Sequence, residues 1–356
     1  MAVRLRDVAL AAGVSTATVS LALSGNPRIS AETAARVVEV ADRLGYRPHA
    51  GARSLRTDST GSLGLVVGDV ANPFFAELAG EIQRAAARAG FSIVLCNCDE
   101  DAARQDEYVR SLLAGRQVDG IILVPTAALT PGLRMAGAAR ERVVFLDRPL
   151  EVAGDGEAER HLAGCPVVRC SPVRAFADTA ALLYDLGHRR VGVIAPPLET
   201  LIGRERRDML LGALAAAGIA ADGVRVVAGD FRQDSGQRAI AGLLDAGGGP
   251  PPTAVVALGG PMAIGAMKGL RAAGLRVPAE ISLVGFDDAP WFELFDPPLT
   301  AIAQPVAALA GAAVRSMVEL LSGGPAEAAE PIDVRPACRL VRRGSCAPPP
   351  VVAADR

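Results

Sequence analysis

The N-terminal part of the chain, up to Gly45, carries apolar residues at helical spacing, interrupted by turn residues. In the first such stretch they recur at i, i+3, i+4 and i+7, which predicts a helix with one buried face. That face consists of Leu5, Val8, Ala9 and Ala12. Gly13 is expected to end the helix. Ser15 is a good N-cap for a second helix that buries Val19 and Leu23.

A third helix is predicted between Ser30, its N-cap, and Gly45. Its expected buried face consists of Ala34, Val38, Ala41 and Leu44. Three short helices with a tight turn between the first two are typical of a helix-turn-helix unit. The outer face of the second helix offers small hydroxyl and apolar groups that can approach base edges in a major groove. The alternative is a solvated polar face.

A short basic segment follows, from Tyr46 to Arg56. A helix of one or two turns is marginal alone, so we expect this segment to become ordered on binding a partner. Leu55 lies between Arg53 and Arg56, and an exposed apolar residue in that setting can act as a wedge in a minor groove. The alternative is a flexible linker.

From Gly61 onwards, short apolar runs alternate with helical patterns of ten to fifteen residues. The predicted strands are Leu63–Val67, Ser92–Leu95, Gly120–Val124, Val143–Leu146, Val191–Ala195, Val224–Val227, Ala254–Leu258 and Ser282–Val284. Repeated β-α units predict an α/β fold with parallel sheets covered by helices on both faces. Ligands of such sheets lie beyond the carboxyl ends of the strands, where Asp69, Asp147 and Asp287 fall.

The charge distribution separates these two parts of the 356-residue chain. Residues 1–58 hold eight arginines and five acidic residues, which leaves 29 of the 37 basic and 34 of the 39 acidic residues for the remainder. A basic front end on an acidic body indicates two different tasks. The six cysteines form no CxxC pair and only three histidines are present, so we expect reduced thiols and no metal or other cofactor. The sequence contains no P-loop, GxGxxG or GxSxG motif, so no motif of this kind indicates an enzyme.

A secreted or periplasmic solute-binding protein is the main alternative. Such a protein requires a cleavable signal peptide. Residues 8–27 follow two arginines and so superficially resemble the apolar region of one. Asp7 and several Ser and Thr residues interrupt that stretch, which argues against a signal peptide. Residues 246–267 are uncharged but contain Pro250–Pro252 and Pro261, so they cannot form one lipid-exposed helix.

Residues 4–56 resemble the headpiece and hinge of the LacI-type (lactose repressor/galactose repressor) transcription regulators. The motifs are DVA-x-x-AGVS-x-x-TVS, a Gly-Asn turn and LGYRP-x-x-x-ARSLR. The resemblance implies base contacts from Thr16, Ala17 and Leu21 and a minor-groove entry by Ala52 and Leu55. It implies phosphate contacts from Ser15, Thr18, Ser20, Ser30 and Thr33. The remaining DNA contacts expected from it are Leu5, Ser24, Arg28, Tyr46 and His49.

Leu21 departs from the family pattern, since many relatives have a long polar or basic side chain there. Its apolar end predicts contact with a thymine methyl group at that operator position.

The resemblance extends to about Arg343 through NPFF, RQVDGII, FLDRP, LGHRRVG and VPAEISLVGFDD. It implies a core of two subdomains similar to periplasmic sugar-binding proteins, with the effector in the cleft. The expected domains are a headpiece at 1–47, a hinge at 48–60 and a core at 61–343. Subdomain 1 would hold 61–162 and 288–320, and subdomain 2 would hold 163–287 and 321–343, with crossings near 162, 288 and 320. Residues 344–356 are expected to be a disordered tail without coiled-coil heptads.

The implied function is a cytoplasmic, nucleoid-associated regulator, expected to act as a repressor on a pseudo-palindromic operator as a homodimer. In the cleft, the resemblance assigns Phe74 and Phe75 as a stacking wall and Phe231 as the opposing aromatic residue. Arg206, Asp147, Asp287 and Gln304 would bind polar groups of the effector. The phenylalanines can alternatively be core residues, and the aspartates strand-end caps.

Several residues of the core depart from the family pattern. Cys170-Ser171 and Gly259-Gly260 stand where relatives often have Asp or Asn, and Thr200, Ile202 and Met209-Leu210 also differ. The loss of hydroxyl-binding side chains argues against a typical hexose. An unusual sugar, a nucleoside, a more apolar molecule or no effector at all are the alternatives that the sequence leaves open.

Overall fold

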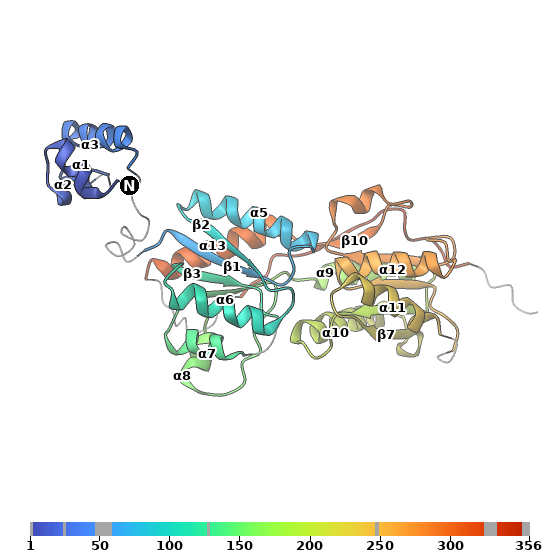
Figure 1. The fold of residues 1–356 in the computed structure, drawn as a ribbon. Helices are drawn as coiled ribbons and strands as arrows, with labels where there is room; N and C mark the ends of the chain where they lie inside the picture. Colours follow the sequence, from blue (N-terminus) through green and yellow to red (C-terminus); the bar gives the residue numbers. More distant parts are fainter. Residues whose placement is uncertain are drawn as a thin grey trace, which may run out of the picture. The chain divides into compact units, whose positions relative to one another are not determined.

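The computed structural model describes residues 3–23, 26–46, 59–126, 129–245, 249–323 and 333–350. The chain divides after Gly61 into a headpiece and a core, which are described separately (Figure 1).

The headpiece consists of helices α1 (Leu5–Ala12), α2 (Thr16–Leu23) and α3 (Ala31–Leu44). Ser15 Oγ accepts a hydrogen bond from the Thr18 amide at 3.1 Å, and Ser30 Oγ accepts one from the Thr33 amide at 3.3 Å. Both residues therefore act as the predicted caps. The helices bury a shared cluster that includes Val8, Val19 and Val37.

The buried face of α3 differs from the predicted one. Val38 is 44% exposed, whereas Val37, Val40 and Ala41 are buried. Ala34, Ala41 and Leu44 of the predicted face do pack against the cluster, so only Val38 was placed wrongly, and Val37 and Val40 complete the apolar face. The neighbouring Val37 and Val38 both suit an apolar face, and packing against α1 and α2 decides between them.

The described helices include no single one that is long and apolar enough to cross a membrane. Helices α1 and α2 pass that test of length and composition only as a pair, and they are bent by 98° at the break between them.

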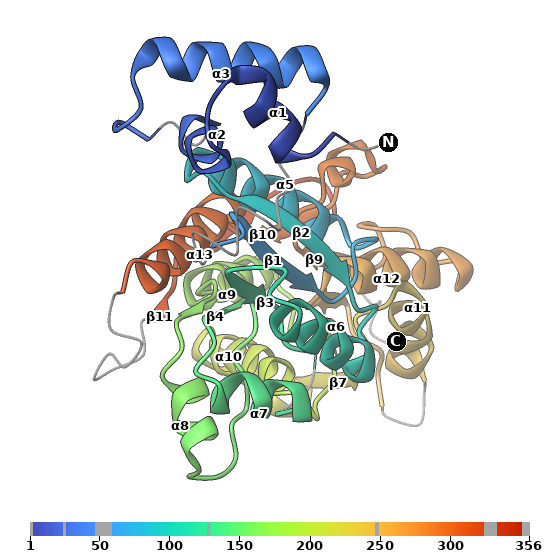
Figure 2. The ribbon, with the colours of Figure 1, turned by 60° about the vertical axis from the view of Figure 1, so that its left-hand side comes forward.

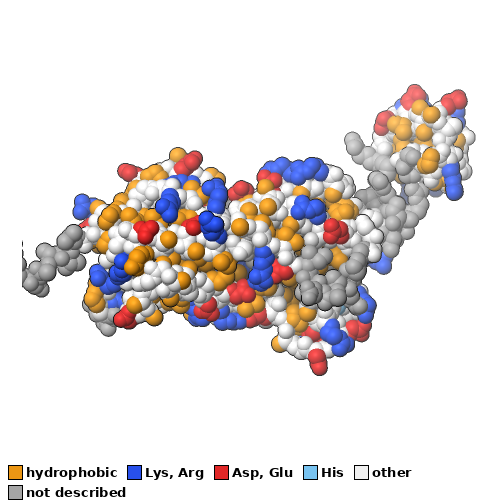
Figure 3. Space-filling view, turned by 180° about the vertical axis from the view of Figure 1, so that it is seen from behind, with side chains coloured by type: hydrophobic (Ala, Val, Ile, Leu, Met, Phe, Trp, Pro, Cys, Tyr) orange, Lys and Arg blue, Asp and Glu red, His pale blue; other side chains and the backbone are white. Residues whose placement is uncertain are grey.

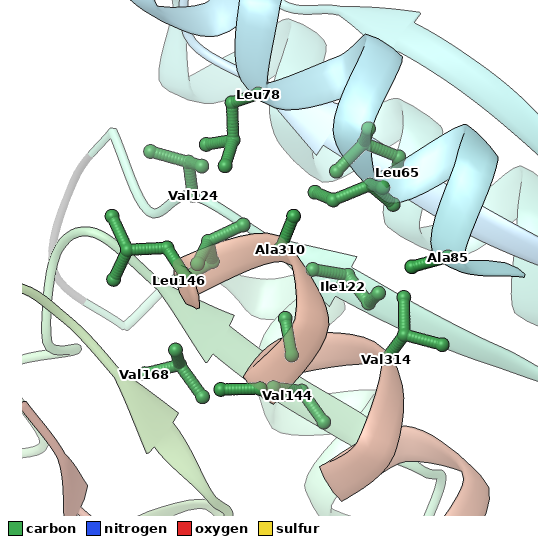
Figure 4. Close-up of a cluster of buried hydrophobic side chains, with 14 of the residues drawn as sticks. Leu65, Leu78, Ala85, Ile122, Val124, Val144, Leu146, Val168, Ala310 and Val314 are labelled. Carbon is green, nitrogen blue, oxygen red and sulfur yellow. The ribbon is translucent and has the colours of Figure 1, made fainter. Parts of the chain in front are cut away.

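The first sheet of the core contains parallel strands in the order β11-β5-β4-β3-β1-β2. The strands are β1 (Ser62–Val67), β2 (Ser92–Asn97), β3 (Gly120–Leu123), β4 (Val143–Leu146), β5 (Val167–Val168) and β11 (Asp333–Val334). Helices α5 (Pro73–Arg88) and α13 (Val306–Leu321) cover one face, and Figure 4 shows the aliphatic cluster they form with the strands. The other face is covered by α6 (Ala102–Ala114), α7 (Pro131–Ala138) and α8 (Glu157–Ala163).

The second sheet has the order β12-β10-β9-β8-β6-β7, with only β12 antiparallel to its neighbour among the described strands. Its strands are β6 (Val191–Ala195), β7 (Val224–Ala228), β8 (Ala254–Ala257), β9 (Ser282–Phe286), β10 (Thr300–Ala303) and β12 (Arg339–Val341). Helices α9 (Val173–Asp185) and α10 (Leu201–Ala216) cover one face. Helices α11 (Gln233–Leu244) and α12 (Gly260–Ala272) cover the other. A short 3-10 helix at Ala221–Gly223 follows α10. Another, at Pro290–Leu294, follows β9.

The chain crosses between the two subdomains at positions other than those predicted. Sheet membership places the crossings at residues 169–172, 304–305 and 335–338, rather than near 162, 288 and 320. The first and third crossings run parallel and are joined by the amide of Ser171, which donates to Pro336 O at 2.9 Å. The error arises because β5 and β11 have only two residues each, too few to show an apolar period.

The predicted disordered tail is wrong for residues 344–350. Ser345 is fully buried, and its hydroxyl accepts a hydrogen bond from the Thr300 amide (2.8 Å) and donates one to Leu283 O (2.6 Å). The buried His188 ring lies 3.0 Å from Ala347 O and 2.9 Å from Thr253 Oγ1, and burial lowers its pKa. The segment is thus an integral part of the second subdomain, while residues 351–356 lie outside the described ones.

Figures 2 and 3 show the core from two further sides. In the turned view of Figure 2, strands β1 and β3 lie between helices α5 and α6. On the face shown in Figure 3, basic and acidic side chains are interspersed, as is typical of a solvated surface.

Substitution of Ser345 by Ala should destabilise the core, because it leaves the buried amide of Thr300 without its acceptor. We expect a loss of about 1–3 kcal/mol in the free energy of unfolding, measured by urea denaturation. Ser322→Ala at the exposed end of α13 is the control, with an expected change within about 0.5 kcal/mol. Equal effects of the two substitutions would show that residues 344–350 do not stabilise the fold.

Candidate functional site

The exposed surface of α2 holds the residues predicted to contact DNA. Ser15, Thr16 and Ala17 are exposed, and Thr18, Ser20 and Leu21 are half-buried. The first amides of a helix have no partner within the helix and carry a positive partial charge, which favours a phosphate. This end of α2 therefore presents small side chains together with backbone donors.

The other predicted DNA contacts fall into three groups. Arg28 and Ser30 are exposed near the start of α3, and Ser30 donates a hydrogen bond to Thr33 Oγ1 at 2.9 Å. Leu5 and Tyr46 pack against the headpiece core, so each has a structural role. Ser24, His49, Ala52 and Leu55 lie outside the described residues.

A buried ion pair connects the two subdomains of the core. Asp147, at the end of β4, is 4% exposed, and Arg206 of α10 is 5% exposed. Arg206 Nη2 donates to Asp147 Oδ1 at 3.4 Å, and the guanidinium lies 4.5 Å from the centre of the Phe286 ring. Burial raises the pKa of Asp147, and the two neighbouring arginines counteract this shift. The pair places the carboxylate and the cation predicted for the effector side by side.

Asp287 and Gln304 form a second polar group at the strand ends. Gln304 Nε2 donates to Asp287 Oδ1 at 2.7 Å, and the Gly260 amide donates to Asp287 Oδ2 at 2.9 Å. A Cβ atom at Gly260 would lie 3.2 Å from the Asp287 side chain, which explains a glycine there. Gln304 Oε1 is buried and accepts no hydrogen bond from the described residues.

Three of the residues predicted for the effector site have backbone φ angles in the left-handed region. The φ angles of Asp147, Phe231 and Asp287 are 62°, 66° and 73°. Residues other than glycine seldom adopt this region, and they do so mainly where the surrounding structure holds them for a function. The surrounding structure therefore holds the backbone of these three residues in a conformation that few residue types adopt.

Arg148 was not among the predicted residues. It is 6% exposed, and its guanidinium donates to both carboxylate oxygens of Glu100, at 2.7 Å each. It also lies 4.3 Å from the centre of the Phe231 ring, which belongs to the other subdomain, and 5.7 Å from that of Phe75. Its position next to Asp147 in the FLDRP motif was the available signal.

The positions of Phe74 and Phe75 do not agree with the predicted stacking wall of the cleft. Both side chains are buried in the cluster between the first sheet and α5, with ring centres 5.1 Å apart. The core interpretation holds for Phe74, and Phe75 reaches the cleft only through its contact with Arg148.

Two cavities lie between the subdomains. The crossover cavity, about 460 Å³, lies along the first crossing and α10, and Asp147 and Arg206 line it. The proline cavity, about 330 Å³, is lined by Pro125, Pro149 and Pro197 together with Arg148 and Phe231. Both share Leu201 and Ile202, and their sizes suit a small molecule. Phe74, Phe75, Asp287 and Gln304 line neither of these two cavities.

Further polar contacts cross the same gap. Arg204 of α10 pairs with Glu151, and Arg232 donates to Asp99 O at 3.1 Å. With Asp147 and Arg206, three acidic residues of the first subdomain face three arginines of the second. Their charges are complementary across the cleft.

Comparisons with known proteins agree with both parts of the chain. The model for bacterial regulatory proteins of the lacI family matches residues 4–49, and that for a periplasmic binding protein-like domain matches residues 180–346. The HTH-type transcriptional repressor CytR of Escherichia coli strain K12 is 33% identical over 304 residues, 85% of each chain. The chain belongs to the lacI family of bacterial regulatory proteins. The lacI-family HTH-type transcriptional repressor PurR of Proteus mirabilis is 32% identical and covers 98% of both chains.

Solved structures extend the likeness to the fold. A complex of the transcriptional regulator CelR with cellobiose has a TM-score of 0.70 at 31% identity and covers 96% of this chain and 99% of its own. The lac repressor dimer bound to operator and an anti-inducer has a TM-score of 0.79 at 26% identity, covering 98% and 100%. The predicted family, fold and function as a DNA-binding transcription regulator are thereby confirmed. The headpiece match disfavours the solute-binding alternative.

Arg206→Met should destabilise this lacI-family regulator, because it leaves the buried Asp147 without its partner across the cleft. We expect a loss of about 3 kcal/mol in the free energy of unfolding, measured by chemical denaturation. Arg207→Met is the matched control, since the adjacent Arg207 pairs with the exposed Asp208 and should change stability by less than about 0.5 kcal/mol. Equal losses of unfolding free energy in the two variants would show that the buried cross-cleft pair stabilises the fold no more than the exposed pair does.

Proposed function

We propose that this regulator binds a pseudo-palindromic operator as a homodimer and represses transcription under the control of a small effector. The effector binds in the cleft between the core subdomains. The observation that supports this most directly is the buried Asp147–Arg206 pair, which lies at the strand ends of one subdomain and on α10 of the other. A ligand that replaces or joins this pair changes how the subdomains meet.

On the DNA side, Thr16, Ala17 and Leu21 select bases in the major groove, with Leu21 against a thymine methyl. Ser15, Thr18, Ser20, Ser30 and Thr33 hold phosphates with the help of the α2 N-terminus. Leu55 bends the duplex as a wedge from the minor groove. Because arginine, hydroxyl and backbone groups of the headpiece hold the phosphates, affinity falls with salt concentration.

On the effector side, a sugar or a nucleoside fits the cleft. CelR was solved with cellobiose, which supports a hydroxylated ligand for a relative. Here Asp147 can accept hydrogen bonds from hydroxyl or amino groups and Arg206 can donate them, and both line the crossover cavity. Phe231, stacked with Arg148, forms the aromatic side of the site.

Effector binding is coupled to DNA binding through the closure of the core. The three crossings are the segments about which the subdomains can move, and the cross-cleft ion pairs differ between open and closed states. Two sites are thereby linked through one element with two arrangements. The protein acts on DNA in the cytoplasm without catalysing a reaction.

Selection from randomised duplex DNA with the full chain, at a fixed salt concentration, tests this function. We expect enrichment of a pseudo-palindrome of roughly 14–20 base pairs with a flexible pyrimidine–purine step at its centre. Candidate sugars and nucleosides are added to parallel selections. Failure to enrich any sequence, with or without them, would overturn the operator-binding function.

Leu55→Ala should weaken specific operator binding far more than non-specific binding. The wedge contributes only where the duplex bends, while phosphate contacts are common to both modes. We expect a loss of about tenfold or more for the selected operator, or about 1.4 kcal/mol, and less than about twofold for unrelated DNA. Fluorescence anisotropy at constant salt measures both. Equal losses on the two duplexes would remove the wedge assignment.

A further inference from the structure

Two cysteines lie where the first and third crossings run side by side, Cys170 on the first and Cys338 on the third. The crossings are paired in parallel at Ser171 and Ala337. The Ser171 amide donates to Pro336 O, and the Cys338 amide donates to Ser171 O, both at 2.9 Å. Because side chains alternate between the two sides of an extended strand, Cys170 and Cys338 lie on the same side of this pair of strands, diagonally across it.

The thiol groups of these two cysteines interact directly. All six cysteines are free thiols in the structure, and Cys170 and Cys338 pack in the same apolar cluster of the second subdomain. The hydrogen bond with the Cys338 thiol, together with burial, holds the pKa of Cys170 well above its usual value. The thiols of Cys98, Cys165 and Cys346 instead donate to backbone carbonyl oxygens. Cys170 and Cys338 are therefore the pair of cysteines whose sulfur atoms are placed to join.

A small oxidant can reach one sulfur atom of the pair. Cys170 is half-buried and lines the crossover cavity, whereas Cys338 is 3% exposed. Arg206 lines the same cavity, and its positive charge favours the thiolate of Cys170 against the effect of burial. The thiolate is the form of cysteine that acts as a nucleophile. Cys170 is thus positioned to react first, slowly at neutral pH because its pKa stays high, and Cys338 is positioned to complete the bond.

A bond between these sulfur atoms acts on both subdomains. Cys170 packs against the apolar clusters of the two subdomains, and hydrogen bonds join the two crossings at this point. A disulfide allows only a narrow range of distances between its two Cα atoms. It therefore holds the first crossing against the third, and movement of the subdomains about the crossings is restricted.

We propose that Cys170 and Cys338 are a redox modification site, at which a peroxide forms a reversible disulfide that fixes the first crossing to the third. The Cys170 thiolate attacks one oxygen of hydrogen peroxide, the O–O bond breaks, and a sulfenic acid forms. The hydroxide that leaves takes up the proton lost by the Cys170 thiol. The Cys338 thiol then attacks the oxidised sulfur, and a second water leaves as the S–S bond forms. A dithiol restores both thiols by exchange and is itself oxidised to a disulfide.

The proposed function gives this bond a consequence for DNA binding. In that function, operator affinity depends on how the core subdomains close, so fixing two of the crossings changes it. The modification itself does not rest on the proposed function, because it involves only the two crossings and the oxidant.

Peptide mapping of the full chain tests the bond. The reduced protein is treated with hydrogen peroxide, alkylated under denaturing conditions and digested without reductant. We expect a cross-linked pair of peptides that contains Cys170 and Cys338, lighter by two hydrogen atoms than the separate peptides, which disappears after treatment with dithiothreitol. Cys170→Ala and Cys338→Ala should each abolish this species. Cys346→Ala, at a half-buried position against the same apolar cluster, is the matched control and should retain it.

Operator affinity before and after oxidation tests the consequence. For the unaltered chain we expect a change of about fivefold or more, reversed by dithiothreitol. Cys338→Ala should show less than about twofold difference between its own peroxide-treated and untreated forms, since it lacks the coupling. Cys346→Ala should respond as the unaltered chain does. Fluorescence anisotropy with the selected duplex at constant salt measures each form, and circular dichroism confirms that each variant is folded.

Each outcome decides the proposal. No cross-link between Cys170 and Cys338, or a cross-link to other cysteines in its place, would overturn the modification site. A cross-link between the two with unchanged operator affinity would overturn its effect on DNA binding. If the DNA selection enriches no operator, the peptide map still decides the modification site, and the missing operator counts against the proposed function alone.

Discussion

The pairing of Asp147 with Arg206 is the interaction on which the arrangement of the core depends. Both groups are almost completely buried, so separating them would leave two charges in an apolar setting. They belong to different subdomains, and each is held by its own surroundings: Arg206 by Leu258 O and the Phe286 ring, Asp147 by the left-handed end of β4. This buried contact thus links the two sheets beside the crossover cavity, together with the more exposed ion pairs across the cleft.

The sequence predicts the central strands well and the edge strands poorly, for a physical reason. β1, β4, β6 and β8 are buried on both sides and appear as continuous apolar runs, which need no alternation to be detected. β5 and β11 have two residues each, and β12 is half-exposed. Their pairing is decided by neighbours that are distant in sequence. The misplaced crossings follow directly, because the chain changes subdomain at these short strands.

The same distinction applies to the candidate site. Asp147, Arg206, Asp287 and Gln304 were predicted from motifs, and the structure places them in two hydrogen-bonded pairs. The pairs are tertiary contacts between segments up to 59 residues apart, so the sequence identified the residues without their partners. Phe74 was assigned to the cleft on its motif, yet the face of α5 directs it into the core. The polar Ser345 gave no signal of burial, because its partners Thr300 and Leu283 lie on two other strands.

Helix α10 links these features through three consecutive residues. Arg204 reaches Glu151 of the first subdomain, Glu205 reaches Arg169 on the first crossing, and Arg206 reaches Asp147. Arg169 in turn lies near Asp333, just before the third crossing. The first turns of one helix are therefore held to the opposite subdomain and to the first crossing. Ile202 and Met209 belong to the same helix and line the crossover cavity. The cavity wall and all three contacts therefore belong to one helix, so a displacement of α10 would alter them together.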